Sequence, residues 1–423
     1  MNVFWFRRDL RLEDNVALYK ATLEKEPVIP LFIFDSEIIA SLPKDDARIT
    51  FIYSTLKNID SELKKLDSSL LIKIGNPLEV WKSLTTEYKI DNVFFNKDYE
   101  PYAIARDLEV TKYLNSQNIE VFAYKDQVIF EESEIVKDDG LPYTVFTPYK
   151  NKWLSKFTKS LISAYNPTSN FYKFKLDFPS LETIGFTEST IKVQPYSLTH
   201  LETYDAIRDY PFIDQTTYVS PYLRFGLVSP RKLIKIALKK NATYLSELIW
   251  REFFMQILFH FPKVVTENFK SKYNQIVWRN NEQEFEKWCK GETGYPIVDA
   301  GMRQLNKTGY MHNRVRMITA GFLCKHLLID WRWGEAYFAE KLLDFDLSAN
   351  NGNWQWAAGT GCDAAPYFRI FNPSEQIKKF DKELKYINKW VTNFNELSYP
   401  QPIVEHKFAR ERALSAYKKG LNS

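Results

Sequence analysis

V-I-P-L-F-I-F, residues 28–34, is a short, continuous apolar run of the kind that forms a strand buried on both faces of a sheet. Four further apolar runs occur at residues 3–6, 70–74, 92–95 and 120–124. Longer amphipathic stretches separate the five runs, and strands that alternate with helices predict a parallel sheet with right-handed crossovers. Residues 1–125 are therefore expected to form an α/β, Rossmann-like domain, although no G-x-G-x-x-G fingerprint follows the first strand.

The remainder of the chain changes character twice. Residues 126–199 are richer in Pro, Ser, Thr, Asn and Lys and lose their periodicity, which is typical of a connection that runs over the surface. From residue 200 onward the periodicity is helical. Because 423 residues are too many for one typical domain, we expect an interdomain linker at 126–199 and an all-α domain at 200–423.

Composition and charge narrow the class of protein. The chain has 45% hydrophobic and 26% charged residues, as globular proteins do, and its net charge of +4 means that any anion-binding surface must be a local basic patch. Three widely spaced cysteines and five scattered histidines predict neither a disulfide scaffold nor a metal site. The sequence shows no signal peptide and no membrane-spanning run. A soluble, cytoplasmic monomer is expected.

One helical segment, S-E-L-I-W-R-E-F-F-M-Q-I-L at residues 246–258, carries two different stripes. One stripe is apolar and continues the core pattern. The other places Glu247, Trp250 and Arg251 on one helical face, which is an unusual mixture for a solvated surface. Two interpretations stay open: a functional face, or a Glu247–Arg251 surface pair beside a half-buried tryptophan.

A polar stretch with paired tryptophans occupies residues 342–361, L-L-D-F-D-L-S-A-N-N-G-N-W-Q-W-A-A-G-T-G. Asp344, Asp346 and Asn350 precede Trp354 and Trp356. Polar groups this dense among aromatic residues are costly to bury unless a partner satisfies them, and a flat ligand with polar edges would do so. A capped helix end with tryptophans in the core is the equally simple alternative.

Several motifs together make the chain similar to the photolyase/cryptochrome family, and most closely to microbial class I photolyases of cyclobutane pyrimidine dimers. The similarity runs from residue 1 to near the C-terminus. The motifs are W-F-R-R-D-L-R-L-E-D-N, E-L-I-W-R-E-F, T-G-Y-P-I-V-D-A-G-M-R-Q-L, M-H-N-R-V-R-M and D-L-S-A-N-N-G-N-W-Q-W-A-A. The resemblance implies an α/β antenna domain, a linker and a helical domain that holds FAD.

The resemblance also implies which residues bind the cofactor. In this family the turn at residues 216–220 would hold the FAD phosphates, Arg316 would pair with Asp344 near the isoalloxazine ring, and Asn350 would face flavin N5. An amide suits N5 because it can donate or accept a hydrogen bond. The implied FAD contacts are Tyr204, Thr216, Thr217, Tyr218, Val219, Ser220, Tyr244, Arg251, Arg316, Asp344, Phe345, Asp346 and Asn350.

The lesion pocket and an electron-transfer chain follow from the same resemblance. The residues implied to contact damaged DNA are Arg208, Glu247, Trp250, Asn313, Arg314, Met317 and Trp356. Trp278, Trp331 and Trp354 would carry electrons from the surface to the flavin, although spaced tryptophans alone indicate core packing. The expected reaction is light-dependent dimer repair, in which excited reduced FAD donates an electron to a flipped-out dimer and regains it.

Two alternative functions stay open, and so does the antenna. A (6-4) photolyase is associated with a histidine pair in the motif that reads M-H-N-R-V-R-M here, and this chain has His312 but Asn313 and Met317. A cryptochrome photoreceptor would bind partners without repair. P-Y-L-R-F-G at 221–226 resembles the cryptochrome side of the family. Folate-binding relatives have an Asn-Glu pair where this chain has Tyr102 and Ala103. The second chromophore could therefore be a deazaflavin, a flavin or absent.

Overall fold

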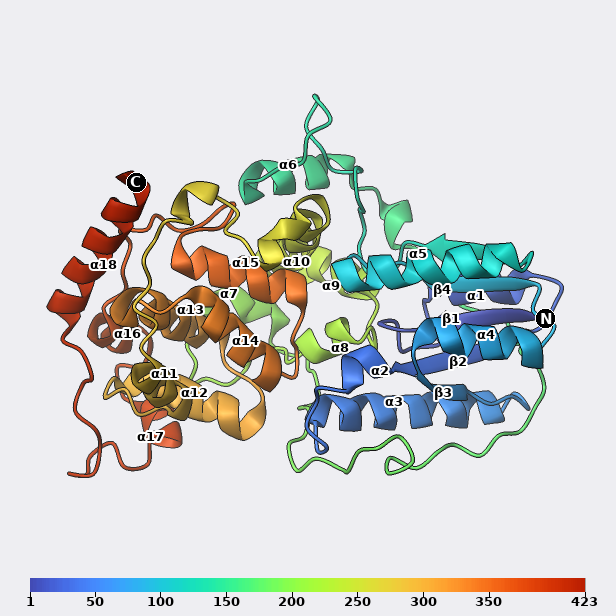
Figure 1. The fold of residues 1–423 in the computed structure, drawn as a ribbon, viewed down its shortest axis with the longest axis horizontal. Helices are drawn as coiled ribbons and strands as arrows, with labels where there is room; N and C mark the ends of the chain where they lie inside the picture. Colours follow the sequence, from blue (N-terminus) through green and yellow to red (C-terminus); the bar gives the residue numbers. More distant parts are fainter. Residues whose placement is uncertain (423) are drawn as a thin grey trace. The chain divides into compact units, whose positions relative to one another are not determined.

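A computed structural model describes residues 1–422 (Figure 1). The chain forms two compact units, each assembled from separate segments. The first contains residues 1–134, 153–196 and 219–239; the second contains residues 135–152 and 197–218 and continues from residue 240. Residues of the expected linker, 126–199, occur in both units, and the domain boundaries drawn from the sequence stay a prediction. Among residues 1–422, no helix has both the length and the apolar composition needed to cross a bilayer.

A parallel sheet of five strands forms the centre of the first unit. The strands are β1 (Asn2–Phe6), β2 (Val28–Asp35), β3 (Leu71–Gly75), β4 (Asn92–Asn96) and β5 (Glu120–Tyr124). Their order is β3-β2-β1-β4-β5, and every neighbouring pair is parallel. In register, Phe4 of β1 lies between Pro30 of β2 and Phe94 of β4. All five predicted strands and the predicted parallel sheet are confirmed.

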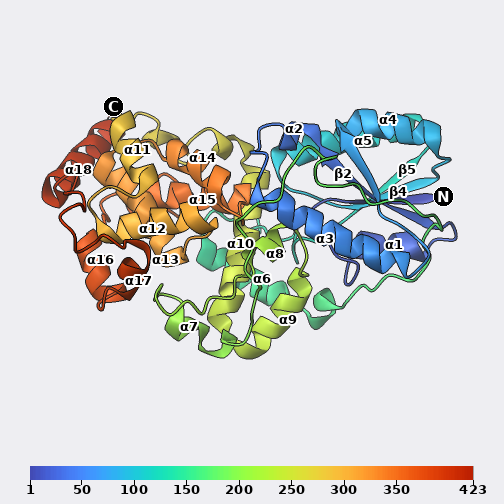
Figure 2. The same ribbon diagram turned by 90° about the horizontal axis from the view of Figure 1, so that it is seen from below.

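Helices cover both faces of this sheet (Figure 2). Because side chains alternate along a strand, Phe4 and Phe6 join one hydrophobic cluster with α1 (Val16–Leu23) and α3 (Ala47–Lys64). Val3 and Trp5 join another with α4 (Pro77–Glu87) and α5 (Pro101–Ser116). The unit also contains α2 (Ser36–Ile39), α8 (Ser220–Arg224), most of α9 (Pro230–Lys240) and a 3₁₀ turn at Lys159–Ile162.

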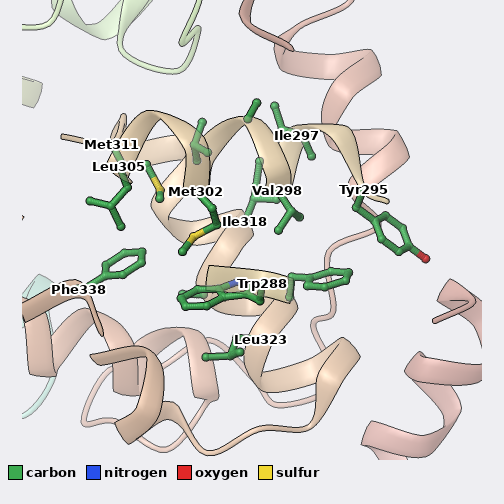
Figure 3. Close-up of a cluster of buried hydrophobic side chains, with 14 of the residues drawn as sticks. Trp288, Tyr295, Ile297, Val298, Met302, Leu305, Met311, Ile318, Leu323 and Phe338 are labelled. Carbon is green, nitrogen blue, oxygen red and sulfur yellow. The ribbon is translucent and has the colours of Figure 1, made fainter. Parts of the chain in front are cut away.

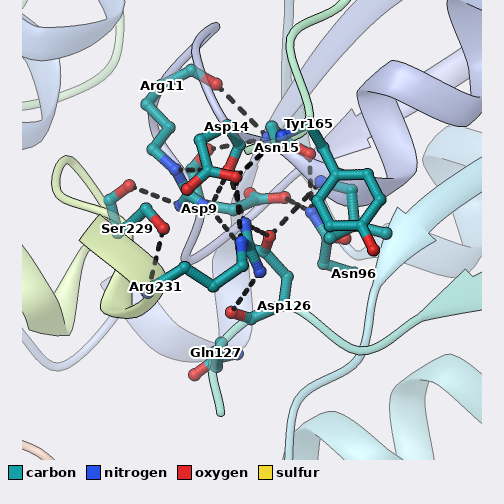
Figure 4. Close-up of polar contacts among 12 residues, drawn as sticks. Asp9, Arg11, Asp14, Asn15, Asn96, Asp126, Gln127, Tyr165, Ser229 and Arg231 are labelled. Atoms are coloured by element: carbon teal, nitrogen blue, oxygen red, sulfur yellow. Dashed lines mark hydrogen bonds and ion pairs between the residues drawn. The ribbon is translucent and has the colours of Figure 1, made fainter. Parts of the chain in front are cut away.

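A buried network of charges lies beside the end of β1 (Figure 4). Asp126 accepts hydrogen bonds from Arg11 at 2.5 Å and from Arg231 at 2.7 Å. Arg231 also reaches Asp14, with its Nε 2.8 Å from Oδ1. Burial would raise the pKa of Asp126, but the two guanidinium groups outweigh burial and hold this pKa below its ordinary value. Ion pairs therefore connect the first motif of the chain to residues from distant segments.

The second unit is helical, as predicted for the C-terminal part of the chain. Its helices are α7 (Tyr204–Ile207), α10 (Ala242–His260), α11 (Glu282–Lys290), α12 (Pro296–Thr308), α13 (Asn313–Gly321), α14 (Trp331–Lys341), α15 (Leu347–Ala358), α16 (Pro373–Phe380), α17 (Lys385–Trp390) and α18 (His406–Asn422), and α6 (Phe146–Lys156) begins in it. Shorter 3₁₀ turns occur at Leu201–Thr203, Pro262–Val265 and Ser271–Tyr273, and a π-helix at Phe322–Leu327. The α/β plus all-α fold class is confirmed.

Trp288 lies at the centre of the second unit's hydrophobic core (Figure 3). Its side chain is fully buried, and its indole N–H donates to the Thr319 carbonyl at 3.1 Å, which satisfies the one polar atom of the ring. Met302 of α12, Ile318 of α13 and Phe338 of α14 belong to the same cluster. The core therefore joins the helices that carry the motifs of the sequence.

Two glycines let α15 lie unusually close to its neighbours. A Cβ on Gly334 of α14 would stand 2.1 Å from the ring of Trp354, and a Cβ on Gly352 would stand 2.2 Å from the ring of Phe254 in α10. Real Cβ atoms do not approach other atoms so closely. These glycines allow the aromatic rings to pack directly on helix backbone, and they fix the depth at which α15 sits.

Candidate functional site

A pocket in the second unit opens between α13, α14 and α15. It contains about 620 Å³ of space free of protein atoms, a volume that includes the open solvent at its mouth. Most of its lining comes from the polar stretch that the sequence singled out, including Asp344, Phe345, Asp346 and Asn350. The structure therefore brings these predicted cofactor contacts together around one pocket.

Arg316 and Asp344 form the charged part of this lining. The Arg316 guanidinium donates from Nη2 to the two carboxylate oxygens of Asp344 at 2.9 and 3.2 Å, and its Nε donates to the Met311 carbonyl at 2.7 Å. Burial would lower the pKa of Arg316, but the carboxylate outweighs it and the pKa lies above its ordinary value. The predicted pairing of these residues is present, and the carboxylate holds the guanidinium in its charged form.

Asp346 has a structural task of its own. It is the N-cap of α15, where its Oδ1 accepts a hydrogen bond from the Ala349 N–H at 3.1 Å and another from the Ser348 hydroxyl. It also lines the pocket. Both interpretations of this stretch therefore apply, because the residue caps the helix and borders the pocket.

Asn350 lies one turn further along α15, and its amide is held from α14. Its Nδ2 donates to the Glu335 carboxylate at 2.8 Å and to the Glu335 backbone carbonyl at 3.1 Å. Sequence reasoning did not identify Glu335. No local pattern points to it, because its role depends on how closely α14 approaches α15.

The tyrosines and threonines predicted to contact FAD form a second polar group. The Tyr244 hydroxyl donates to Thr217 at 3.4 Å, and the ring of Tyr204 packs edge-on against that of Tyr244 at 5.0 Å. Thr216 shares a hydrogen bond with Tyr310 at 3.0 Å.

The remaining predicted cofactor residues are placed individually. Tyr218 adopts a left-handed conformation with φ of 51° and donates to Asp214. Val219 and Ser220 stand at the start of α8 and belong to the first unit. Arg251 is half-buried in α10.

The residues predicted to contact a lesion divide into two groups. Asn313, Met317 and Trp356 line the same pocket as Asn350. Glu247 forms an ion pair with Arg208, and Arg314 donates to Asp209 at 2.7 Å. The two arginines expected to meet DNA phosphates are thus each paired with an acidic residue of the protein.

Trp250, the predicted second wall of the lesion pocket, is itself covered. Its indole stacks on Phe146 with ring centroids 3.7 Å apart and planes 9° apart, and it also contacts Phe254 at 5.3 Å. The Phe146 N–H donates to Asp363 at 3.0 Å, which fixes the start of α6. Phe146 was not predicted, because it lies far from Trp250 in the sequence.

The three tryptophans of the expected electron-transfer chain belong to one aromatic region. Trp331 and Trp354 are buried members of the core around Trp288, and Trp278 packs against that core from a half-buried position. Trp354 also borders the pocket. Trp331 donates its indole N–H to Asn268 at 2.8 Å, and the ring of Trp278 is 5.9 Å from that of Tyr417.

His312 precedes α13 and caps it. Its Nδ1 accepts the Arg314 N–H at 3.2 Å, so the neutral ring carries its proton on Nε2. Burial lowers the pKa of His312 to about 4, from an ordinary value of 6.5. The folded protein therefore keeps this imidazole neutral where the unfolded chain would protonate it.

Acidification should therefore destabilise the protein through His312. The contribution of His312 to the free energy of unfolding is complete well above pH 6.5. It is lost as the pH falls towards 4, because only the unfolded chain takes up the proton in this pH range. The full loss is about 3 kcal/mol. In urea titrations between pH 7 and pH 5, His312→Asn, which keeps a capping side chain, should flatten the pH dependence by up to one proton. A slope in His312→Asn equal to that of the wild type would contradict the assignment.

Comparison with known proteins identifies the family. Residues 2–168 match the family model described as DNA photolyase, and residues 244–398 match the FAD binding domain of DNA photolyase. The chain belongs to the DNA photolyase family. A deoxyribodipyrimidine photo-lyase of Agrobacterium fabrum is 35% identical to this family member, over 98% of this chain and 97% of the relative.

Solved structures of photolyases agree in fold along the whole chain. A bacterial class III photolyase from Agrobacterium tumefaciens superimposes with a TM-score of 0.90 at 32% identity, covering 100% of this chain and 98% of the other. An archaeal photolyase from Sulfolobus tokodaii with two FAD molecules has a TM-score of 0.87 at 36% identity, covering 99% and 100%. This family member is thus a photolyase-type enzyme with an FAD-binding domain.

The pocket of this photolyase family member fits its cofactor. A flavin ring has two flat apolar faces and a polar edge of nitrogen and oxygen atoms. For the flat faces of the ring, the lining offers Phe345 and Trp354. For the polar edge, it offers the Arg316–Asp344 pair and Asn350. The Asn350 Nδ2 is already engaged by Glu335, so the free Oδ1 is the atom left for a ligand.

Proposed function

We propose that this enzyme repairs cyclobutane pyrimidine dimers in DNA in a light-dependent reaction. The observation that carries the proposal is that one pocket is lined both by the flavin-type contacts Arg316, Asp344 and Asn350 and by Asn313, Met317 and Trp356. A cofactor and a substrate that share one pocket can exchange an electron directly. The A. fabrum relative, named a deoxyribodipyrimidine photo-lyase, supports the same reaction class.

The residues at the mouth have separate tasks in this proposal. Bound reduced FAD supplies the light-driven electron chemistry. Trp356 and Met317 offer apolar and polarisable surface to the puckered rings of a flipped-out dimer. The Asn313 side chain can hydrogen-bond the lesion or the adjoining backbone. Glu247 lies on α10, where its carboxylate can accept the N–H edge of a pyrimidine.

DNA binding must compete with ion pairs inside the protein. Arg208 is bonded to Glu247, and Arg314 to Asp209, with side chains 19–37% exposed. A phosphate that approaches either arginine replaces a carboxylate partner, so part of the electrostatic gain is lost. In return, Glu247 is released to contact the lesion, which couples backbone binding to base recognition. Affinity for DNA should also fall with salt, because these contacts are to phosphates.

The deciding test is illumination of oligonucleotides that contain one defined lesion. We expect the wild-type enzyme with reduced FAD to restore dimer-containing strands and to leave (6-4) lesions unchanged. Glu247→Ala should lower the dimers repaired per absorbed photon by about tenfold, the loss expected for a hydrogen bond to a charged group, with FAD content unchanged. Glu286→Ala removes an exposed acid of the Glu286–Lys290 pair and should repair normally. Normal repair by Glu247→Ala would show that the carboxylate has no part in the reaction.

The same assay separates the alternatives. A (6-4) photolyase would restore only the (6-4) strand; the lining residues Asn313 and Met317, in place of the histidines typical of that activity, argue against it. A cryptochrome photoreceptor would restore neither strand, and the cryptochrome-like P-Y-L-R-F-G motif at 221–226 is the observation in its favour. Assignment to class I among the photolyases remains part of this proposal.

The tryptophan chain and the antenna are further parts of the proposal. Trp278, Trp331 and Trp354 would return electrons to oxidised flavin, since they lead from a half-buried site through the core to the pocket. At the position where folate-binding relatives have an amide, the Tyr102 hydroxyl donates to Asp35 at 2.8 Å. Ala103 follows it and is buried. The S. tokodaii relative with two FAD molecules supports a flavin as the second chromophore, and a deazaflavin or no antenna are the alternatives.

A further inference from the structure

Glu335 is a half-buried acid of α14 that directly contacts the pocket residue Asn350. Two of its oxygen atoms accept from Asn350, whose Nδ2 lies 2.8 Å from the carboxylate Oε1 and 3.1 Å from the backbone carbonyl oxygen. Burial raises the pKa of Glu335 above its ordinary value, and the hydrogen bond from Asn350 opposes this only in part. A carboxyl oxygen accepts a hydrogen bond in either protonation state, so the contact persists whether or not the acid ionises.

These two contacts fix which way the Asn350 amide points. A backbone carbonyl can only accept a hydrogen bond, so an amide turned by 180° would place oxygen against oxygen. The carboxyl group of Glu335 adds a second acceptor on the same side. Both N–H bonds of the amide are then consumed by Glu335, and Oδ1, a pure acceptor, is the only polar atom of Asn350 that remains for a ligand in the pocket.

Helix packing makes this contact possible. Gly334 precedes Glu335, and its lack of a side chain lets the Trp354 ring rest against α14. Trp354 is one turn beyond Asn350 on α15, so the same close approach brings the Glu335 carbonyl within reach of the amide. The orientation of Asn350 is therefore set by backbone geometry together with one side chain.

We propose that Glu335 is a positioning residue that holds the Asn350 oxygen toward the flavin and so selects the reduced form of FAD. Reduced flavin carries a hydrogen on N5 and donates there, whereas the N5 of oxidised flavin carries a lone pair and accepts. A hydrogen-bond acceptor fixed at this place favours reduced flavin, whose N5 donates, and repels oxidised flavin, whose N5 carries a lone pair. The inference deepens the proposed function and rests on its placement of flavin N5 at Asn350.

The test is an equilibrium redox titration of the FAD-loaded protein, followed by flavin absorbance. Glu335→Met keeps the volume and removes the side-chain acceptor, so that only the backbone carbonyl is left to hold the amide in its orientation. We expect the ratio of reduced to oxidised flavin at a fixed potential to fall about fivefold, as for the loss of one hydrogen bond. Glu335→Gln keeps an oxygen acceptor and should stay within twofold of the wild type. FAD content and melting temperature, measured on the same samples, report whether either variant disturbs the fold.

A double-mutant cycle with Asn350 makes the test independent of such disturbance. If Glu335 acts through the amide, Glu335→Met should have no further effect on the flavin ratio in an Asn350→Ala background. An equal fivefold effect in that background would overturn the inference, and so would an unchanged ratio in Glu335→Met alone. A Gln variant as impaired as Met would show that charge, rather than an acceptor, is what matters, and would also overturn it.

Failure of the proposed function looks different. It would be seen in the wild-type protein, as FAD-loaded enzyme that leaves dimers unrepaired under light. A wild-type enzyme that repairs dimers while the Glu335→Met variant titrates unchanged would contradict only the inference. If the Asn350→Ala variant has the same ratio of reduced to oxidised flavin as the wild type, the placement of N5 on which the inference rests is contradicted.

Discussion

Gly334→Ala is expected to destabilise the protein and to remove most of its FAD. The new methyl group would lie 2.1 and 2.5 Å from two carbons of the Trp354 ring and 2.6 Å from Leu323. Trp354 is 2% exposed and packs edge-on against Phe338 and Trp288, so neighbouring rings resist its displacement. Helix propensity favours alanine over glycine by about 1 kcal/mol. Overpacking a rigid core costs about 1–3 kcal/mol or more, and contacts this short belong at the upper end, so the clash should win.

The loss of FAD follows because α14 can relieve the clash only by moving away from α15. That movement separates Glu335 from Asn350 and shifts Trp354 at the edge of the pocket. The experiment measures melting temperature and the flavin absorbance of purified protein.

Gly321→Ala is the matched control. Gly321 is also helical, and its added methyl would meet only Phe371, at an ordinary 3.7 Å. This variant should be neutral or slightly more stable. A Gly334→Ala protein as stable and as yellow as the Gly321→Ala protein would show that the interface between α14 and α15 tolerates expansion.

Asp344→Ala should have the second large effect. It removes both hydrogen bonds between the carboxylate and Arg316, whose side chain is only 26% exposed. Removing one partner of a buried pair leaves an uncompensated charge and costs about 3–5 kcal/mol. The partial exposure of Arg316 to the pocket places the expected cost near about 3 kcal/mol. Urea titration measures this loss, and the flavin absorbance of the same samples should show that FAD is lost.

A double replacement separates the structural from the cofactor-binding role of the pair. Hydrophobic residues in place of both partners often restore stability, so Arg316→Met with Asp344→Leu should recover most of the lost free energy and still lack FAD. Glu375→Ala, in the exposed Glu375–Lys378 pair, should change neither property. FAD bound at full stoichiometry in Asp344→Ala would refute a cofactor role for the pair.

The sequence was sufficient for the parts of the fold that depend on local pattern. The apolar run at 28–34 is a buried central strand even though it contains Pro30, which lacks a hydrogen-bond donor. Its continuous hydrophobicity outweighed that defect, because a strand covered on both faces gains more from burial than one missing bond removes. The polar stretch at 342–361 was likewise recognisable, since buried acids and amides require partners.

The partners themselves were beyond local pattern. Glu247 lies on α10 and was weighed against a pair with Arg251 one turn away, yet its guanidinium partner is Arg208 of a different segment. Trp250 was expected to face a ligand, and Phe146 covers it. The contact between Glu335 and Asn350 was not predicted from the sequence either. Each of these contacts depends on how closely two separate segments pack, and helical periodicity identifies a buried face without naming what covers it.

The charge network beside β1 constrains the order in which the first unit can be completed during synthesis. All five strands have been made once residue 124 leaves the ribosome, but Asp14 and Asp126 then lack Arg231, which follows more than a hundred residues later. Until it arrives, the Asp14 carboxylate lacks its guanidinium partner and Asp126 has only Arg11, and burying a charge without a partner is costly. The nascent sheet thus has all of its strands before its buried carboxylates have all of their ion-pair partners. A fragment that stops just after Asp126 contains every strand and both carboxylates and yet lacks the guanidinium of Arg231 that pairs with them.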